Sequence, residues 1–344
     1  MRIAVIGFGR VGRAFVQLLV DKKPHLKREG IHTRIVYIID LGGGIYRRGG
    51  IPYEDLAELP KTKIPPFSYP RGGSKDVTFD SLLEKRDVDV VIEMTPTNKD
   101  TGEPGMTHIK ESLAHGMHVV TSNKGPILLA YKQLNELARR NNVQLGIGCA
   151  CGAALPALNG GIIDMAGSTI VSIEGVLNGT TNFIINEMEA NKVSYEEALA
   201  EAQELGIAET DPRLDVEGWD TASKLLILTN VLMNEEKSLR DISVSGITAL
   251  TQNDIDRAKK ENKKYRLVGK TLKVNDELHM SVKLETMPKG HPFYDLEGAN
   301  KAVRYVSDTL GDLTLVGGAS DLRSAAASIL RDCINIHRGY TFSR

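Results

Sequence analysis

A glycine-rich segment near the start of the chain is the first pattern that could do chemistry. It directly follows an apolar run and reads G-x-G-x-x-G over Gly7, Phe8, Gly9, Arg10, Val11 and Gly12. In such a segment two glycines let the backbone turn tightly and approach a pyrophosphate, and the third lets a helix pack closely on a strand. The helix then directs N–H groups and the positive end of its dipole at the phosphates. The segment predicts a dinucleotide site, against the alternative of a tight turn that binds nothing.

An acidic residue, Asp40, ends the next predicted strand. A carboxylate at this position accepts hydrogen bonds from the adenosine ribose and disfavours a 2′-phosphate. Asp40 lies further along the chain than the usual spacing of about 20 residues, because the intervening segment is long. Arg47 and Arg48 follow in the next loop, from which arginines can bind a 2′-phosphate. Asp40 therefore favours NAD, while the two arginines keep NADP open.

Two lysines stand where they could exchange a proton with a substrate. Lys224 lies four residues after Asp220 in a predicted helix, so the two side chains share one face. Lys124 follows a predicted strand that ends at Thr121, at the carboxyl edge of the sheet where a nicotinamide ring would lie. A lysine suits this chemistry once burial or a neighbouring cation lowers its pKa. By spacing alone, the Asp220–Lys224 pair also fits a surface ion pair worth about 0.3–0.5 kcal/mol.

Two regions with different patterns must position these residues. Up to about residue 145, short β-branched runs alternate with amphipathic stretches, which is typical of a parallel sheet covered by helices on both faces. After about residue 150, residues 265–274 and 278–285 alternate with period two around a polar turn, Asn275-Asp276, which indicates antiparallel strands. The predicted fold class is therefore α/β: a Rossmann-type parallel sheet domain followed by an α+β domain.

The same patterns suggest how the chain is divided into domains. We expect a dinucleotide-binding domain over residues 1–140 and a second, substrate-binding domain over residues 141–304. Residues 305–344 contain a further strand and helix. We expect this C-terminal segment to return to the first domain and complete its sheet.

The middle of the chain resembles the homoserine dehydrogenases, and the resemblance extends over nearly the whole length. The first matching stretch comprises EMTPTN at 93–98, GEP at 102–104 and HVVTSNKGP at 118–126. The second and third are GVLNGTTNFI at 175–184, and LGIAETDP at 205–212 followed by DVEGWD at 215–220 and Lys224. A weaker match is HPF at 291–293 with GAN at 298–300. The resemblance implies NAD- or NADP-dependent interconversion of L-homoserine and L-aspartate 4-semialdehyde, in threonine and methionine biosynthesis.

The resemblance also implies a role for each matching residue. Lys224 would be the acid/base group, with Lys124 as its partner or alternative. Residues that would hold the substrate ammonium or orient the lysine are Glu209, Asp215 and Asp220. Residues that would form a polar wall beside the substrate are Asn178, Gly179 and Thr180. Residues that would line the cofactor near its nicotinamide end are Thr95, Ser122, Lys124 and Gly318. Read alone, several of these would be turn or loop residues, and only their joint occurrence behind a dinucleotide fold favours the catalytic interpretation.

One segment departs from the family pattern. Family members have an acidic residue before the sequence ALP at 154–156, in a segment whose backbone carbonyls bind a monovalent cation, whereas this chain has Gly148. A sodium or potassium ion is therefore doubtful, with the carbonyls of Cys151 and Ala153 as its remaining ligands. Cys149 and Cys151 also raise the alternatives of a thiol enzyme, such as aspartate-semialdehyde dehydrogenase, or half a metal site. We expect them instead to be small apolar residues packed at the domain junction.

Composition excludes several other classes of protein. The 344 residues are 41% hydrophobic and 25% charged, with a net charge of −1, so neither nucleic acid nor a membrane is an expected partner. The apolar run that follows Met1 and Arg2 is too short for a signal peptide, and three cysteines do not suggest a disulfide scaffold. We expect a cytoplasmic protein with a small-molecule substrate. The resemblance implies a homodimer without a regulatory domain, and hence little feedback inhibition by threonine. The alternative from another class is a non-catalytic dinucleotide-sensing protein.

Overall fold

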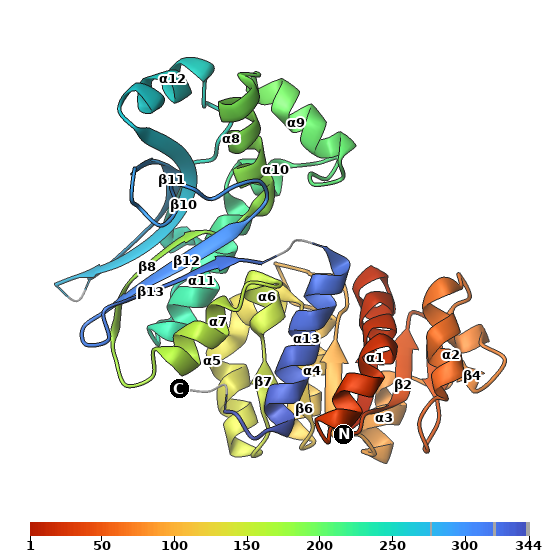
Figure 1. Ribbon diagram of the computed structural model, residues 1–344. Coiled ribbons are helices and arrows are strands. Elements are labelled where there is room, and N and C mark those ends of the chain that lie inside the picture. Colours follow the sequence, from red (N-terminus) through yellow and green to blue (C-terminus); the bar gives the residue numbers. More distant parts are fainter. Residues whose placement is uncertain (276, 319–320, 342–344) are drawn as a thin grey trace. The chain divides into compact units, whose positions relative to one another are not determined.

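The computed structural model describes residues 1–275, 277–318 and 321–341, and its contacts divide the chain into two units (Figure 1). The first unit comprises Met1–Ala153 and Asp321–Arg344, and the second comprises Ala154–Ser320. Relative to the boundaries expected at residues 140 and 304, residues 141–153 join the first unit and residues 305–320 join the second.

A seven-stranded sheet forms the centre of the first unit, in the order β4-β3-β2-β1-β5-β6-β7. Strands β2, β1, β5, β6 and β7 are parallel, and β3 and β4 add an antiparallel edge. The strands are β1 (Arg2–Ile6), β2 (Arg34–Asp40), β3 (Gly43–Tyr46), β4 (Gly73–Ser74), β5 (Val90–Glu93), β6 (His118–Thr121) and β7 (Leu145–Gly146). The predicted Rossmann-type parallel sheet is confirmed.

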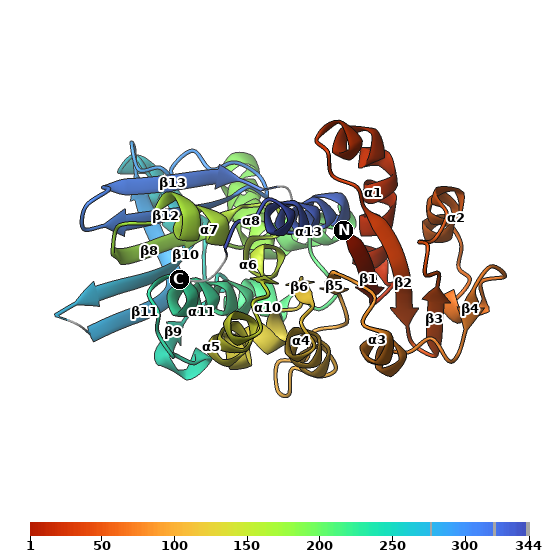
Figure 2. The same cartoon turned by 90° about the horizontal axis from the view of Figure 1, so that it is seen from below.

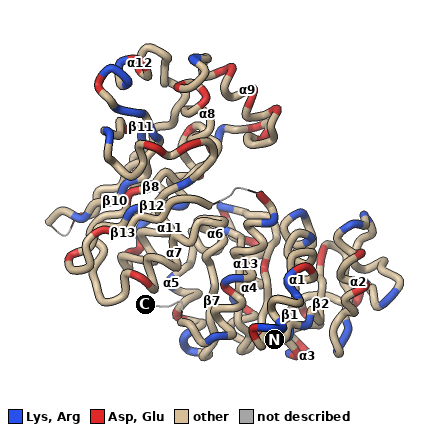
Figure 3. The backbone as a smooth tube through the Cα atoms, in the orientation of Figure 1, with Lys and Arg blue, Asp and Glu red and all other residues tan. Residues whose placement is uncertain are grey.

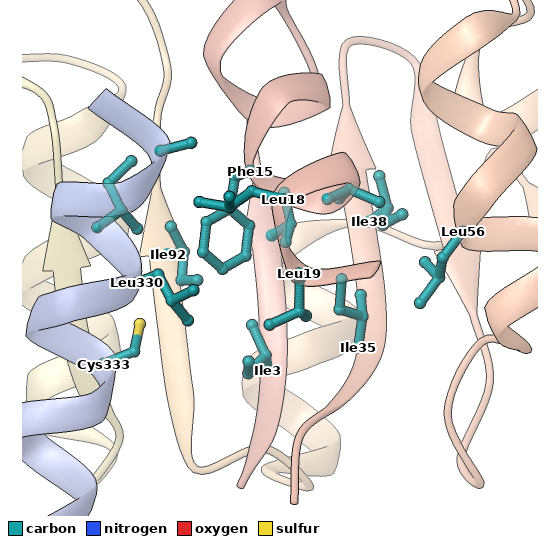
Figure 4. Packing of buried hydrophobic residues seen from close by; sticks show 14 of the residues in the cluster. Ile3, Phe15, Leu18, Leu19, Ile35, Ile38, Leu56, Ile92, Leu330 and Cys333 are labelled. Atoms are coloured by element: carbon teal, nitrogen blue, oxygen red, sulfur yellow. The ribbon is translucent and has the colours of Figure 1, made fainter. Parts of the chain in front are cut away.

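Helices cover both faces of this sheet, which is why its central strands are continuous apolar runs. Figure 2 shows α1 and α13 on one side of the strands and α3, α4 and α5 on the other. The helices of this unit are α1 (Arg10–Arg28), α2 (Tyr53–Glu58), α3 (Phe79–Lys85), α4 (Gly105–Ala114), α5 (Lys124–Arg140), α6 (Gly148–Gly152) and α13 (Leu322–His337), with 3-10 turns at Leu59–Lys61 and Pro66–Ser68. In the core, Ile3 of β1, Phe15 of α1 and Leu330 of α13 belong to one buried cluster (Figure 4).

The second unit contains a six-stranded sheet in the order β13-β12-β8-β10-β11-β9, antiparallel except for the β9–β11 pair. The strands are β8 (Ile170–Val176), β9 (Ile242–Val244), β10 (Lys263–Val274), β11 (Glu277–Pro288), β12 (Lys301–Ser307) and β13 (Asp312–Gly317). The predicted antiparallel hairpin is confirmed, although Asp276 in its turn lies outside the described residues. The expectation that residues 305–344 complete the first sheet is wrong. The connection from β12 to β13 is short, so β13 pairs with its neighbour as a hairpin, and this segment adds only α13 to the first unit.

Helices of the second unit pack on β8 and β10, the central strands of its sheet. The helices of this unit are α7 (Ala157–Asn159), a π-helical turn (Gly160–Asp164), α8 (Gly179–Asn191), α9 (Tyr195–Glu204), α10 (Arg213–Val216), α11 (Trp219–Leu232), a 3-10 turn (Leu239–Asp241) and α12 (Gln252–Lys260). The helices that contact the sheet most directly are α8, α11 and α12. Strand β8 leads directly into α8 through Leu177 and Asn178. Because β8 is a central strand, this connection lies near the middle of the sheet.

A charged cluster joins three strands of this sheet. Glu174 of β8 accepts a hydrogen bond from Lys270 of β10 at 2.9 Å and lies 3.4 Å from Arg304 of β12 and 3.7 Å from His291. Burial acts to raise the pKa of Glu174, but the hydrogen bond from Lys270 and the neighbouring cations outweigh it and lower that pKa. Elsewhere positive and negative residues are interspersed along both units (Figure 3). Among the described residues, no helix has both the length and the apolar character needed to span a bilayer.

Candidate active site

The glycine turn between β1 and α1 has the geometry that a dinucleotide requires. Gly7 has φ +90°, and a Cβ there would lie 2.7 Å from the backbone of Met94. A Cβ on Gly12 would lie 2.2 Å from the Gly7 carbonyl oxygen, so only glycine lets α1 start this close to the turn. Gly9, by contrast, has nothing within 4 Å of an added Cβ. The turn is therefore closed on the protein side and open where a pyrophosphate would approach.

The N-terminus of α1 leaves its first N–H groups available to a ligand. Gly9 is the N-cap residue, and no described side chain caps the helix there. Arg10 is exposed at the first helical position, whereas Phe8 is buried in the core and has the Arg13 guanidinium 4.6 Å above its ring. An uncapped helix N-terminus of this length fits an anionic phosphate group.

Asp40 lies next to this turn, at the carboxyl end of β2. The N–H of Gly7 donates to the Ile39 carbonyl at 2.9 Å, which fixes the turn beside the end of β2. Asp40 is half-buried and pairs with Gly43 in the β2–β3 hairpin. Its carboxylate is thus positioned at the edge of the sheet where the ribose of a dinucleotide is expected.

The hairpin carries the two arginines away from Asp40. Because β3 runs antiparallel to β2, the N–H of Arg47 donates to the Val36 carbonyl at 3.0 Å. Val36 lies four residues before Asp40, which is about 13 Å along a strand at about 3.3 Å per residue. The backbone of Arg47 is therefore set back along β2 from Asp40, and a contact between Arg47 or Arg48 and a 2′-phosphate stays a prediction.

The remaining residues of the first unit that were predicted to line a cofactor lie in the turns that follow β5 and β6. Thr95 is the second residue after β5, and its N–H donates to the Glu93 carboxylate at 2.9 Å. Ser122 follows β6, and its N–H donates to the Glu93 backbone carbonyl at 3.2 Å. Lys124 is the first residue of α5, whose N-cap is Asn123. Since β1, β2, β5 and β6 are parallel neighbours, these turns and the glycine turn share one edge of the sheet. Sequence reasoning missed Glu93 and Asn123, although an acid that ends a buried apolar strand was a usable signal.

Lys224 in the second unit is held by two anchors. Its Nζ lies 2.6 Å from Asp220 Oδ2 and donates to the Leu177 carbonyl at 2.8 Å. The lysine and aspartate side chains are only 13% and 14% exposed, so the pair is not the surface ion pair that spacing alone suggested. The shared helix face predicted from the sequence is present on α11.

Asn178 connects this pair to a second aspartate. Its Nδ2 donates to Asp215 Oδ1 at 2.6 Å and to Asp220 Oδ2 at 2.9 Å. Its Oδ1 accepts from the Thr181 N–H at 2.9 Å and so caps α8. One amide therefore satisfies the start of a helix and bridges two carboxylates.

The other predicted substrate residues border this network. Gly179 begins α8, and Thr180 donates from Oγ1 to the Ile207 carbonyl at 3.1 Å, which ties the loop after α9 to the start of α8. Glu209 lies in that loop and is exposed, and its backbone carbonyl accepts from Gln203 at 3.1 Å. The structure thus unites Asn178, Asp215, Asp220 and Lys224 in one hydrogen-bonded network, with the Glu209 carboxylate facing solvent.

Gly318 adopts a conformation that only glycine takes easily. Its φ is +82°, and a Cβ there would lie 2.8 Å from Leu155. The next two residues of this glycine turn, Ala319 and Ser320, lie outside the described residues. The predicted contact between Gly318 and a cofactor stays a prediction.

The segment expected to bind a monovalent cation does not supply the carboxylate of the family pattern. The N–H of Gly148 donates to Asp332 Oδ2 at 2.8 Å, so the carboxylate found here comes from α13 and is engaged with the backbone. Ala153 ends α6 with φ +51°. No cluster of three or more metal-ligating side chains occurs in the described part of the chain. The carbonyls of Cys151 and Ala153 remain the predicted ligands at this segment.

The cysteines of the same segment are enclosed. Cys149 and Cys151 are 7% and 1% exposed, and the Cys149 thiol donates to the Ala325 carbonyl at 3.5 Å. A nucleophilic thiol must reach its substrate, so this burial disfavours the thiol-enzyme alternative. The two side chains pack as the small apolar residues that the sequence suggested.

Parts of both units match families of known proteins. Residues 156–334 match the family model described as homoserine dehydrogenase, and residues 72–147 match the model described as its NAD binding domain. A crystal structure from Archaeoglobus fulgidus, provisionally described as a homoserine dehydrogenase, superposes with a TM-score of 0.86 at 30% identity, covering 98% of this chain and 99% of that one.

Two curated relatives are similar over their full lengths. The homoserine dehydrogenase of Methanocaldococcus jannaschii is 36% identical, covering 98% of each chain. The NAD(+)-dependent homoserine dehydrogenase of Pseudomonas canavaninivorans is also 36% identical, covering 99% of this chain and 97% of the relative. End-to-end similarity at this level, with the dinucleotide turn and the lysine network both in place, shows that this chain belongs to the homoserine dehydrogenase family of NAD(P)-dependent oxidoreductases.

Proposed function

We propose that the protein interconverts L-homoserine and L-aspartate 4-semialdehyde with Lys224 as the group that exchanges a proton with the substrate oxygen. The observation that carries this proposal is the anchoring of its amine, which lies 2.6 Å from Asp220 Oδ2 and 2.8 Å from the Leu177 carbonyl. Both anchors belong to the same unit as the lysine, so the amine is oriented before a substrate arrives. A positioned acid/base group of this kind contributes about 10²–10⁴-fold in rate.

The proposed proton transfer follows from the charge that develops on the substrate. When bound, NAD(P)H supplies a hydride to the aldehyde carbon. Negative charge then develops on the aldehyde oxygen, and Lys224 stabilises it and donates the proton that completes the hydroxyl group. In the opposite direction the neutral amine of Lys224 accepts the hydroxyl proton. Asp220 keeps the amine oriented in both directions. By family resemblance, Lys124 is the second candidate for this proton transfer.

Acidic residues near Lys224 support recognition of an amino-acid substrate. Homoserine carries an α-ammonium group, and Asp215 and Glu209 provide carboxylates that attract it. Asp215 is joined to the lysine network through Asn178 at 2.6 Å, while Glu209 is exposed and so accessible to a ligand. Gly179 and Thr180 complete the proposed polar wall at the start of α8.

Substitution of the lysine tests the proposal. Lys224→Ala is expected to lower kcat by about 10²–10⁴-fold because it removes the proton donor, while the dissociation constant of NAD or NADP stays within about twofold. The matched control is Lys270→Met, which removes another paired lysine of the same unit and should leave kcat nearly unchanged. A Lys224→Ala enzyme with wild-type turnover would remove Lys224 from the mechanism.

We also propose that NAD is the preferred dinucleotide. The support is the half-buried Asp40 beside the glycine turn, together with the antiparallel hairpin that carries Arg47 toward Val36. Asp40→Ser should raise kcat/KM for NADP relative to NAD by about tenfold, because it removes the repulsion between a carboxylate and a 2′-phosphate. An unchanged ratio would show that another residue sets the preference.

By family resemblance, we further propose that the second unit pairs two subunits and that the enzyme serves threonine and methionine biosynthesis. Light scattering of the purified protein should give twice the chain mass of 37.6 kDa. A single-chain mass at micromolar concentration would contradict the dimer.

A further inference from the structure

We propose that Glu93 is a positioning residue whose buried carboxylate holds together the two turns that carry Thr95, Ser122 and Lys124. The inference rests on the proposed function only in taking these turns as the nicotinamide end of the cofactor site. Glu93 ends β5 and is 0% exposed. Burying a carboxylate is costly unless hydrogen bonds satisfy it. The donors that bind the Glu93 carboxylate therefore indicate its role.

The first set of donors comes from the turn that follows β5. Glu93 Oε1 accepts from the Thr95 N–H at 2.9 Å and also from the Thr95 hydroxyl. Thr95 is therefore held by both its backbone and its side chain. These hydrogen bonds hold the turn against the end of β5. The turn also lies beside the glycine turn, since a Cβ added to Gly7 would lie 2.9 Å from the Thr95 nitrogen.

The second set of contacts reaches the turn that follows β6. The Thr121 hydroxyl lies 2.9 Å from Glu93 Oε2 and 3.1 Å from the Glu93 carbonyl, either of which can accept its single hydrogen. The same Thr121 oxygen accepts from the Asn123 N–H at 2.9 Å. Asn123 Oδ1 in turn accepts from the Gly125 N–H at 3.1 Å and caps α5. Lys124, between these two residues, is thus fixed at the start of its helix by a relay that begins at Glu93.

The two turns are also packed against one another. Asn123 Nδ2 donates to the carbonyls of Thr95 and Pro96 at 3.3 and 3.4 Å. A Cβ on Gly125 would lie 2.2 Å from the Asn98 carbonyl oxygen, so the loop after β5 rests directly on the first turn of α5. No side chain larger than hydrogen fits there. The two turns therefore pack together above the Glu93 carboxylate, and we expect Thr95 and Lys124 to move together.

The helix α4 closes the other side of the carboxylate. A Cβ on Gly105 would lie 3.2 Å from Glu93 Oε2 and 2.6 Å from Asn123 Nδ2. His108, one turn later, places Nδ1 at 3.9 Å from Glu93 Oε1. Glu93 is thus enclosed by β5, β6 and α4, and its effect on a ligand must act through the turns that it holds.

Dinucleotide binding without substrate tests the inference. In Glu93→Ala, both turns lose their common acceptor, and the dissociation constant of NADH, measured by its fluorescence, should rise by about tenfold. NADPH serves as a second probe in case it binds more tightly. Glu93→Gln keeps the shape and one acceptor oxygen, while its amide can donate to the Thr121 hydroxyl, so it should bind within about threefold of wild type. Rescue by this conservative variant separates positioning from a need for charge.

A matched control distinguishes positioning from general stability. Asp55 is another buried carboxylate of the same unit, held by Tyr69 at 2.9 Å and by Arg71, and it touches neither turn. Asp55→Ala should lower the Tm as Glu93→Ala does but leave the NADH dissociation constant unchanged. If Glu93→Ala does not fold, Thr121→Val removes one hydroxyl of the relay and should raise that constant by about threefold.

Two results would overturn the inference. The first is wild-type NADH affinity in folded Glu93→Ala or Thr121→Val. The second is an equal loss of affinity in Asp55→Ala. Because these measurements need no substrate, they stay informative even if Lys224→Ala retains turnover and the proposed proton donor is wrong.

Discussion

The glycine turn of the first unit and the lysine network of the second are built in opposite ways. The turn is six consecutive residues, and its ligand-facing groups are backbone N–H groups at the start of α1. The network joins side chains from distant positions, Asn178, Asp215, Asp220 and Lys224. A backbone site depends on the absence of side chains at Gly7 and Gly12, whereas the network depends on the presence of particular ones. We therefore expect added side chains to disrupt the glycine turn and removed side chains to disrupt the lysine network.

After Lys224→Ala, the largest effect should come from breaking the network at Asp220. Asp220→Ala leaves the Lys224 amine without its 2.6 Å partner and leaves Asn178 Nδ2 without one of its two acceptors. We expect kcat to fall by about 10²–10³-fold, with the dinucleotide dissociation constant nearly unchanged. Steady-state kinetics and NADH fluorescence on the same preparation provide the check. A parallel loss of cofactor affinity would mean that the two sites are not separable.

The reciprocal effect should come from filling the glycine turn. In Gly12→Val the new side chain starts 2.2 Å from the Gly7 carbonyl oxygen, so the turn and α1 must separate. We expect dinucleotide binding to weaken by more than about tenfold and the free energy of unfolding to fall by about 1–3 kcal/mol. Turnover at saturating dinucleotide should change much less than KM. A variant that binds NADH normally would show that close packing here is not needed for binding.

A smaller effect on activity is expected at Asn178, whose side chain both caps α8 and bridges two aspartates. Asn178→Ala loses the helix cap, worth about 1 kcal/mol, and the amide that bridges two aspartates. Asn178→Asp keeps an acceptor for the Thr181 N–H but brings a third carboxylate beside Asp215 and Asp220. We expect Asn178→Asp to be the less stable variant in urea and also the less active one, because repulsion among three partly buried carboxylates outweighs the retained cap. Wild-type activity in both variants would argue that the bridging amide has no role.

The smallest effect concerns pH and stability outside both sites. The pKa of Glu174 is lowered in the folded state, since the Lys270 hydrogen bond and nearby cations outweigh its burial. Its stabilisation is therefore present above its unfolded pKa of about 4.3 and is lost as the pH falls through the folded value. Glu174→Gln should lower the free energy of unfolding by about 1–2 kcal/mol at pH 7. In urea titrations the difference between the two proteins should shrink as the pH is lowered below the unfolded pKa, and a difference that does not change with pH would contradict this origin.

The same contrast explains what the sequence could predict. The glycine turn, its strand and its helix were predictable because the necessary residues are contiguous and their spacing has one physical meaning. The partners Asp220 and Lys224 were predictable only as a helical pair, because nothing local indicates that the Leu177 carbonyl and Asn178 complete the anchoring. Glu93 could have been recognised as an acid that ends a buried strand, but its hydrogen-bond partners could not be assigned, since they come from later segments of the chain.

One expectation failed because strand pairing is not local information. We expected the C-terminal strand to return to the first sheet together with the last helix, whereas the short hairpin of β13 with β12 fixes it in the second sheet. The residues of β13 were interpreted correctly as a strand, but the sequence did not indicate which strand they pair with.

The tight β2–β3 hairpin has a consequence for anyone who wishes to redesign coenzyme choice. Only Leu41 and Gly42 separate the two strands, and Gly42 has φ +83°, which disfavours a side chain. Leu41 is 91% exposed and supports no packing. A cationic residue introduced at position 41, alongside a neutral residue at position 40, is therefore the least disruptive pair of substitutions for shifting coenzyme preference toward NADP.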